Sequence, residues 1–310
     1  MRRRDVGRRR ATLSMIPLAL MLVAEAWAAP PRAERILSMA PAATEILFAM
    51  ELGDRIVGVT QYCDHPPEAL SKPRVATLLD IDLETLLAIS PDLVILSDLN
   101  ETSKARIERL GIATYTLWHR SLDELCASIE GLGAACGEDE RGRAVAGELR
   151  MAMREAQELT RGRERPRVVV AVDRDVGDPS IRSIYIAGRE SVYDEMIRLA
   201  GGVNAFERTG VTYPRLSIEG FLGLDPDVII DIVGDHGFQL GLVSEDVRAQ
   251  WSGLSDLKAF KEGRIYVRFG NDALHPGPRT ARALRQFVAF IHPELAREED
   301  LDGVLVAGGP

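Results

Sequence analysis

The pattern of hydrophobic and polar positions contains one unit that occurs twice along the chain. Residues 82–96 read DLETLLAISPDLVIL and residues 217–231 read SIEGFLGLDPDVIID, so the two copies are 135 positions apart. In each copy a capping residue precedes a short apolar stretch at helical spacing, a Pro-Asp pair interrupts it, and a β-branched run follows. Each copy therefore predicts a helix, a turn and a buried strand, and the repetition indicates a chain with two similar halves.

The two predicted helices share one apolar face and one acidic residue. At roughly 100° per residue, three apolar side chains of each copy fall on the same face and are predicted to be buried. These are Leu83, Leu86 and Leu87 in the first copy, and Ile218, Phe221 and Leu222 in the second. Glu84 and Glu219 project to the side of that face and should meet solvent. Each acid complements the helix dipole, which is worth about 0.3–1 kcal/mol, but its presence in both halves favours a shared role.

Strands and helices alternate in the rest of both halves, which predicts an α/β fold with a mainly parallel sheet covered on both faces. The predicted strands are 35–39, 54–59, 112–118, 167–172 and 264–267, and the predicted helices are 42–50, 101–110, 121–136, 192–199, 244–254 and 279–291.

One segment interrupts this alternation and divides the chain into domains. Residues 138–164 carry no strand pattern, and their apolar residues lie among Arg and Glu, which predicts one long amphipathic helix ending before Pro166. The first half therefore spans 34–137 and the second 165–295. The acidic, glycine-containing tail 296–310 is expected to be frayed.

The first 28 residues differ in composition from the rest. Six arginines precede an apolar run at 13–24, and Ala26-Trp27-Ala28 fits the cleavage site of a secretory signal peptide, cut after Ala28. The run contains Pro17 and falls short of the ~20 residues of a membrane span. Arg9-Arg10 loosely resembles a twin-arginine signal, so the Sec and twin-arginine routes both fit. No cysteine lies near the site to carry a lipid, and the product is predicted to be free in a periplasm.

Composition and charge narrow the class of protein. The 310 residues are 46% hydrophobic and 27% charged, as expected of globular material with room for two domains of about 130 residues each. The net charge is −9, and a leader charge of +4 leaves −13 on the mature part. That charge disfavours nucleic acid and anionic membranes as partners.

Three cysteines are an odd number for an oxidising compartment, so at least one thiol is unpaired or intermolecular. On one continuous helix, Cys126 and Cys136 would lie about 15 Å apart, too far for a disulfide. Both are predicted to be small core residues. Cys63 lies in a polar loop with two prolines.

Sequence signatures of catalysis are absent. The chain contains no G-x-S-x-G, G-x-x-x-x-G-K-[ST], H-E-x-x-H or C-x-x-C motif. The five histidines have no metal-ligand spacing, which argues against a zinc or manganese receptor. The partners in Asp64-His65 and Asp235-His236 are adjacent in sequence, so their side chains diverge on regular structure. We expect no catalytic residue, no metal site and no cofactor; an α/β enzyme and a metal-ion receptor are the alternatives of another class.

Candidate ligand-binding residues come from the loops. Aromatic residues make up only 5% of the chain, yet Tyr62 and Tyr213 each lie in a proline-containing loop at a junction of strand and helix, in opposite halves. Open α/β sheets bind ligands beyond the carboxyl ends of their strands, so two facing halves would make a cleft. Tyrosines there supply flat apolar contact and a hydroxyl for a ligand. The alternative is that each ring only packs against its own loop and stabilises it. His65 and His275 also lie in loops at that end of the sheets.

Several motifs in order resemble the substrate-binding proteins of ABC importers for cobalamin, ferric siderophores and haem. They extend over about residues 34–292 and include SMAPAATEILFA at 38–49, VGVTQYCDHPPEA at 57–69, the repeated unit, AGRES at 187–191 and LAGGVNAF at 199–206. The Tyr-x-Asp-x-Pro-Pro loop most resembles the cobalamin-binding members of that family.

The resemblance implies two Rossmann-like lobes joined by one rigid helix, here 138–164, with a ligand cleft between the lobes. It also implies that one surface glutamate of each lobe docks onto arginines of the permease dimer, and Glu84 and Glu219 match those positions. The protein would be a monomeric, non-enzymatic periplasmic receptor that delivers a metal chelate, cobalamin first, to an ABC importer.

The resemblance leaves the chelate open. Leu78 and Tyr213 stand where the cobalamin binders have tryptophans, so an apolar slot is kept with a weaker stacking platform. Arg174, Arg215 and Arg279 could serve an anionic ferric siderophore.

Haem is the third possible ligand. Tyr62, His65 or His275 could coordinate haem iron, and Gly277-Pro-Arg-Thr280 resembles a turn of haem-binding relatives. The predicted ligand-binding residues are Tyr62, Asp64, His65, Leu78, Arg174, Tyr213, Asn271 and His275.

Overall fold

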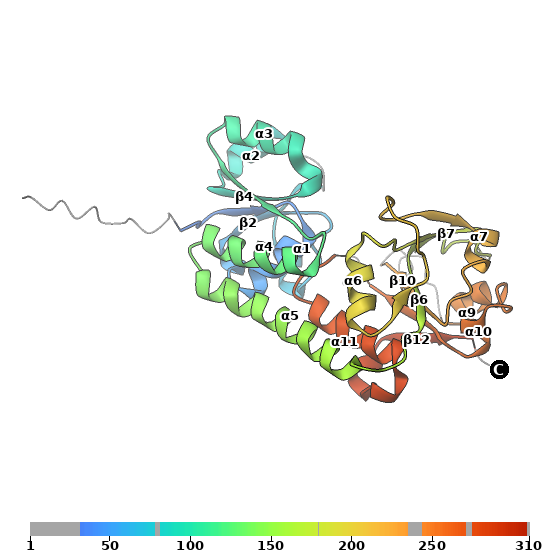
Figure 1. The fold of residues 1–310 in the computed structure, drawn as a ribbon. Helices are drawn as coiled ribbons and strands as arrows, with labels where there is room; N and C mark the ends of the chain where they lie inside the picture. Colours follow the sequence, from blue (N-terminus) through green and yellow to red (C-terminus); the bar gives the residue numbers. More distant parts are fainter. Residues whose placement is uncertain (1–31, 78–80, 179, 235–243, 271–274, 309–310) are drawn as a thin grey trace, which may run out of the picture.

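The chain folds into two α/β lobes joined along one side by a long helix (Figure 1). The computed structural model describes residues 32–77, 81–178, 180–234, 244–270 and 275–308. The predicted signal peptide lies outside the described residues, as do the candidates Leu78 and Asn271. Within the described ranges, no helix is long and apolar enough to cross a membrane.

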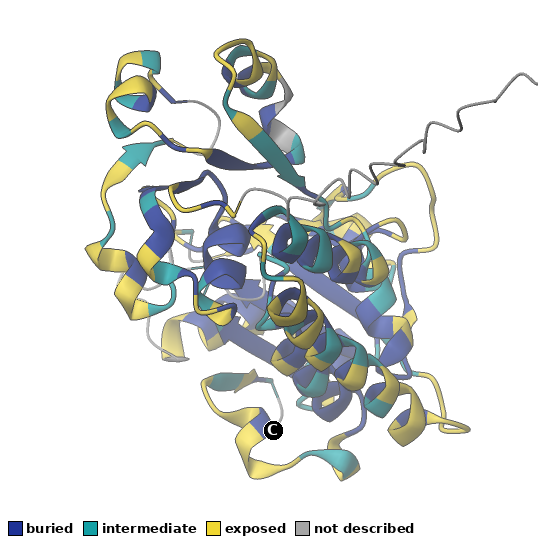
Figure 2. Cartoon of the chain, turned by 90° about the vertical axis from the view of Figure 1, so that its left-hand side faces the viewer, coloured by how far each residue is buried: buried dark blue, intermediate teal, exposed yellow. Residues whose placement is uncertain are grey.

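The first lobe is built on a parallel sheet of five strands in the order β3-β2-β1-β4-β5. Every residue of β4 is buried, as expected of a strand covered on both faces, and the sheets are dark blue at the centre of the molecule in Figure 2. The strands are β1 (Ile36–Ser38), β2 (Ile56–Thr60), β3 (Arg74–Ala76), β4 (Leu93–Ser97) and β5 (Ala113–Leu117), and the helices are α1 (Pro41–Ala49), α2 (Leu83–Ile89), α3 (Glu101–Arg109) and α4 (Leu122–Ala135).

The second lobe has a mixed sheet in place of the mainly parallel one expected. Its main path is β12-β11-β10-β6-β7-β9, with β8 paired to β6; β7, β9 and β12 pair antiparallel. The β6–β7 connection is shorter than the dozen or so residues of a crossover, so β7 returns antiparallel. The strands are β6 (Arg167–Arg174), β7 (Ser183–Ile186), β8 (Val203–Asn204), β9 (Arg215–Ser217), β10 (Val228–Val233), β11 (Ile265–Phe269) and β12 (Val304–Ala307), and the helices are α6 (Val192–Leu199), α7 (Ile218–Leu222), α9 (Ser244–Ser252), α10 (Lys258–Lys261) and α11 (Thr280–Ile291).

The expectation of a frayed tail over 296–310 is wrong for its described part. Val304–Ala307 form β12, which pairs antiparallel with β11 and places Val306 opposite Tyr266. Ala307 is fully buried. The edge of β11 offers unpaired backbone groups, and a β-branched segment that reaches it satisfies them.

The long helix predicted for 138–164 is α5 (Asp139–Thr160). It packs against α4 of the first lobe and α11 of the second (Figure 1). Ala146 belongs to the core of the first lobe and Ala156 to a core of the second. A Cβ on Gly133 of α4 would lie 2.8 Å from the Cα of Gly142 on α5, so glycine permits the close approach of these helices. One continuous helix thus contributes to both cores, which restricts relative motion of the lobes.

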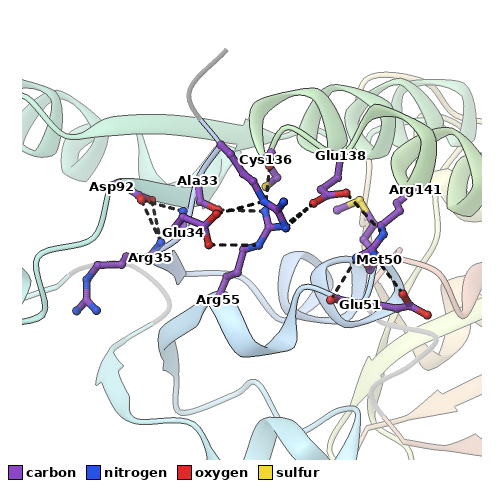
Figure 3. A network of polar contacts seen from close by, with 11 residues as sticks. Ala33, Glu34, Arg35, Met50, Glu51, Arg55, Asp92, Cys136, Glu138 and Arg141 are labelled. Carbon is purple, nitrogen blue, oxygen red and sulfur yellow. Dashed lines mark hydrogen bonds and ion pairs between the residues drawn. The ribbon is translucent and has the colours of Figure 1, made fainter. Parts of the chain in front are cut away.

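A buried arginine fastens the start of α5 to the first lobe (Figure 3). The Arg55 guanidinium donates to the backbone oxygens of Ala33 (3.2 Å) and Cys136 (3.1 Å) and pairs with the carboxylate of Glu138, the residue before α5. The Arg55 side chain is 8% exposed and that of Glu138 16%. Removal of either partner would leave the other charge buried without a counter-ion, which is strongly unfavourable. This ion pair therefore stabilises the start of α5 against the first lobe.

The two repeated units form equivalent structures. The side chains of Asp82 and Ser217 each accept a hydrogen bond from the backbone N–H three residues on, at 2.9 and 3.3 Å, and so cap α2 and α7 as predicted. Each unit also has a residue with positive φ at the same position after its helix, Ser90 (45°) and Asp225 (38°).

The Pro-Asp pair of each unit has a structural role at the start of its lobe. The Asp92 carboxylate accepts from the backbone N–H of Arg35 (3.1 Å), just before β1, and the Asp227 carboxylate accepts from that of Arg167 (2.7 Å), the first residue of β6. The repeat therefore specifies a helix and also the anchoring of the first strand of its lobe.

All three cysteines are buried free thiols. The core positions predicted for Cys126 and Cys136 are confirmed, and Cys63 is buried as well. Burial raises the pKa of Cys136 to about 12, so that thiol stays protonated at neutral pH.

Candidate ligand site and partner surface

The loop after β2 presents Tyr62 to solvent. Tyr62 is 49% exposed and lies in a tight turn in which the Cys63 N–H donates to the Thr60 carbonyl. One nitrogen of the Arg74 guanidinium, on β3, donates to the carbonyls of both Thr60 and Cys63 at 2.7 Å. The backbone on both sides of Tyr62 is therefore fixed while its ring remains available for contact.

His65 lines a cavity of ≈ 400 Å³ at the junction of the two lobes. The lining residues of the first lobe are Glu45, Phe48, Ala49, His65, Pro66 and Glu68, and those of the second lobe are Pro278 and Arg279. His65 and Arg279, both named from the sequence, are thus brought to the same cavity.

An ion pair spans the lobes inside this cavity. The guanidinium of Arg279, just before α11, donates from Nε to Oε2 of Glu45 on α1 at 2.8 Å and makes a second bond to Oε1. The Glu45 side chain is 4% exposed and that of Arg279 27%. A bidentate arginine–carboxylate pair of this kind is directional and strong, so the charge of Arg279 is already matched by the protein.

Tyr213 is the exposed aromatic residue of the second lobe. It is 45% exposed and packs edge-to-face on Tyr193 of α6, with ring centroids 6.4 Å apart. Its loop lies close to Gly188, whose N–H donates to the Thr212 carbonyl; a Cβ there would lie 2.2 Å from the carbonyl oxygen of Val211. The loop therefore packs directly against the backbone of Gly188, where any larger side chain would clash with it.

Arg174 does not lie at the surface of a cleft. It belongs to β6 rather than to the loop after it, and its guanidinium, 2% exposed, bonds Asp231 (3.0 Å) and Gln250 (2.6 Å) beneath the ring of Trp251. A buried arginine needs such partners. The Arg174 side chain is therefore not accessible to a ligand, contrary to the prediction.

Three further candidates, Asp64, Arg215 and His275, are at least partly exposed. Asp64 is exposed and His275 is half-buried. Arg215 donates to the Ser183 hydroxyl at 3.0 Å and lies over the ring of Tyr185. Among the residues that the structure places, no group of three or more His, Cys, Asp or Glu side chains could hold a metal ion.

The predicted exposure of the repeat glutamates is confirmed. Glu84 on α2 and Glu219 on α7 are both exposed. Hydrogen bonds from its own backbone N–H and from the Ser217 hydroxyl lower the pKa of Glu219, so its carboxylate is charged at neutral pH. Each lobe thus presents one carboxylate to solvent on the first turn of an equivalent helix.

Comparison with known proteins decides the class of this protein. The sequence model of the periplasmic binding proteins matches residues 36–268. The chain belongs to this family. It is therefore a transport receptor that binds a small ligand and not an enzyme, and the family resemblance inferred from the loop and repeat motifs is confirmed.

Named relatives of the family cover most of the chain. The Vitamin B12-binding protein of Vibrio cholerae is 30% identical over 85% of this chain and 91% of its own length. The crystal structure of BtuF, the periplasmic vitamin B12 binding protein of Vibrio cholerae, has a TM-score of 0.69 at 29% identity, covering 86% of this chain and 99% of that one. The apo periplasmic heme-binding protein RhuT from Roseiflexus sp. RS-1 has a TM-score of 0.71 at 28% identity, covering 85% and 100%.

Two functional features were not predicted from the sequence. Arg74, which fixes the Tyr62 loop, carries no local signal. Glu45 does: it is the only charged residue in PAATEILFA, and an acid within an apolar helix indicates a buried partner. That partner, Arg279, lies 234 residues further along the chain, and the local pattern around Glu45 does not indicate it.

Proposed function

We propose that this protein is the periplasmic receptor of an ABC importer and that its ligand is cobalamin. The observation that supports this ligand is that the charges of Arg174 and Arg279 are already matched by the carboxylates of Asp231 and Glu45. A corrinoid presents mainly amide side chains, so its binding requires no uncommitted cation. Exposed tyrosine rings in the two lobes, Tyr62 and Tyr213, supply apolar contact for a flat macrocycle. The similarity to vitamin B12-binding proteins agrees with this choice.

Haem or a ferric siderophore is the second candidate. The similarity to a heme-binding protein at 28% identity favours it, and the exposed hydroxyl of Tyr62 or the imidazole of half-buried His65 would coordinate iron. We further propose export with cleavage after Ala28, by the Sec or twin-arginine route, and docking of Glu84 and Glu219 onto the permease.

Titration of the mature protein with cyanocobalamin, haemin and a panel of ferric siderophores tests the ligand. Tryptophan quenching and visible spectra report binding and iron coordination. Cyanocobalamin is expected to bind, and the other two to bind weakly. Tight haemin binding with a shifted Soret band, without cobalamin binding, would overturn the cobalamin proposal and establish the second candidate.

Tyr62→Ala and Tyr213→Ala are each expected to weaken cyanocobalamin binding about 10-fold, because each removes an exposed ring worth about 1–1.5 kcal/mol of contact. Both side chains are about half exposed, so each variant should remain folded. Tyr62→Phe and Tyr213→Phe are the matched controls and should keep most of the affinity. If Tyr62→Phe loses cyanocobalamin binding as completely as Tyr62→Ala, the hydroxyl and not the ring is the contact; loss of haemin binding in Tyr62→Phe would instead indicate that the hydroxyl coordinates iron.

Glu45→Gln is expected to raise the affinity for haemin and carboxylate siderophores about 10-fold and to leave cyanocobalamin binding unchanged. The substitution removes the charge that faces Arg279, and a charge-assisted hydrogen bond is worth about 1.5–3 kcal/mol. Glu68→Gln is the control, since Glu68 lines the same cavity but is exposed. Calorimetric affinities measure the effect; an equal gain from both substitutions would mean that overall charge, and not the Glu45–Arg279 pair, excludes anions.

A further inference from the structure

A carboxylate of the second lobe binds the first residue of a helix in the first lobe. Oε2 of Glu195, on α6, accepts a hydrogen bond from the backbone N–H of Leu122, the first residue of α4, at 2.7 Å. The N–H groups of the first helical turn have no partner within their own helix. The cap residue Ser121 accepts from a different one, that of Glu124, at 3.1 Å. The second lobe therefore completes the capping of α4.

This contact is shielded from water on both sides. The Glu195 side chain is 18% exposed, and Leu122 is fully buried. Although Leu122 belongs to the first lobe by sequence, it packs within a core cluster of the second. The other oxygen of the Glu195 carboxylate lies 3.7 Å from Arg198, which is 56% exposed and contributes little. A charged acceptor at the positive end of a helix, away from water, makes a stronger bond than the same pair in water.

The contact joins two segments that lie beside the expected ligand site. α6 also carries Tyr193, whose ring packs edge-to-face on Tyr213 with centroids 6.4 Å apart. α4 begins after the short loop that follows β5, in which the Arg120 guanidinium lies 4.9 Å from the centroid of the Trp118 ring. That loop is at the carboxyl end of its strand, the edge at which open α/β sheets bind ligands. α4 and α6 lie on facing sides of the two lobes (Figure 1), so Glu195 links the support of Tyr213 to this edge of the first lobe.

We propose that Glu195 is a positioning residue for ligand binding. By holding the N-terminus of α4, its carboxylate sets the distance at which Tyr213 and the rest of the second lobe face the first. The inference rests on the proposed function in one respect, that the ligand binds between the lobes. Neither Glu195 nor Leu122 lines the cavity at the lobe junction. Glu195 therefore acts through the placement of other groups, and its loss lowers the fraction of molecules in the binding-competent arrangement.

Glu195→Ala in the mature protein tests the proposal through the distance between the lobes. Ala105→Cys on α3 and Ala249→Cys on α9 place one spin label on each lobe; both positions are exposed, and the three native thiols are buried. Double electron–electron resonance without ligand should give a longer and broader distance distribution for Glu195→Ala than for the labelled parent. Calorimetry with cyanocobalamin should give an affinity about 5–10-fold lower, as expected when about 10–20% of the molecules remain competent.

Two variants and one measurement on the wild type serve as controls. Glu195→Gln keeps an oxygen that accepts from the Leu122 N–H, so it should retain the parent distances and most of the affinity. Asp194→Ala removes a carboxylate from the same turn of α6, one that lines a cavity formed by second-lobe residues, and should match the parent in both measurements. Hydrogen exchange needs no substitution: the Leu122 amide should exchange slowly, unlike an ordinary first-turn amide.

The outcomes separate this inference from the proposed ligand. An unchanged distance distribution in Glu195→Ala, or rapid exchange of the Leu122 amide in the folded wild type, overturns the inference. Equal changes in Asp194→Ala and Glu195→Ala would also contradict it, since charge on α6 and not the contact would then be the cause. A longer distance with unchanged affinity would refute the positioning role and the placement of the ligand between the lobes. The same loss measured with haemin, in a protein that does not bind cyanocobalamin, supports the inference and changes only the ligand.

Discussion

Reversal of both repeat glutamates, in the variant Glu84→Lys/Glu219→Lys, is expected to abolish stimulation of the importer ATPase while ligand affinity stays unchanged. Both side chains are exposed and neither lines the cavity at the lobe junction. If each carboxylate meets an arginine of the permease, reversal replaces an attraction with a repulsion. Loss of a buried interfacial charge pair costs about 2–5 kcal/mol, so loss of two pairs costs about 4–10 kcal/mol, which is comparable to the whole binding free energy of a micromolar complex, about 8 kcal/mol.

The matched control for this prediction is Glu148→Lys, which reverses an exposed charge on α5. It should leave ATPase stimulation at the wild-type value. Isothermal titration with cyanocobalamin, or with whichever chelate binds, checks that the ligand site of each variant is intact. Full ATPase stimulation by the double variant would exclude the docking role. Both glutamates would then serve only to complement the dipoles of their helices.

Arg174→Met is expected to lower the free energy of unfolding by about 3–5 kcal/mol, because it leaves a buried carboxylate without its cation. Asp231 is 1% exposed, and the hydrogen bond that its carboxylate accepts from the Trp251 indole, at 2.9 Å, does not replace the lost positive charge. Urea unfolding followed by circular dichroism measures the loss. The double variant Arg174→Met/Asp231→Leu should recover most of it, since apolar residues of similar volume can replace a buried pair.

Arg182→Met serves as the control for this second prediction. Arg182 also pairs with a carboxylate, that of Asp178, but is 80% exposed, and surface pairs are worth about 0–1 kcal/mol. If the Arg174→Met variant is as stable as the wild type but binds the ligand less tightly, Arg174 contributes to ligand binding after all.

Elements with strong local signals were predicted accurately. The helix expected at 192–199 is α6, over the same residues, because Ser191 caps it and Gly201, at φ 79°, ends it. The long helix α5 was also predicted, since its apolar stripe is continuous over 22 residues. These features depend on neighbours within one or two turns.

Strand direction and the fate of the tail were predicted less well. An apolar β-branched run has the same pattern whether it pairs parallel or antiparallel, so the return of β7 and the pairing of β12 with β11 depend on loop length and on a free sheet edge. Leu87 on α2 is 57% exposed and Leu222 on α7 is 37% exposed, although the apolar pattern predicts both to be buried, and the explanation is similar. Helical periodicity shows which residues share a face, but not how much of that face another element covers.

The amino-acid sequence by itself determined the two-lobed α/β organisation, the family, the linking helix and the exposed glutamates, because these follow from local periodicity, capping and a repeated motif. Only the tertiary structure decided which candidate side chains remain available to a ligand. Arg174 and Arg279 have the same charge in the sequence as any surface arginine, and their partners Asp231 and Glu45 lie 57 and 234 residues away. Burial and pairing across such distances are set by packing of whole elements, which no local pattern encodes.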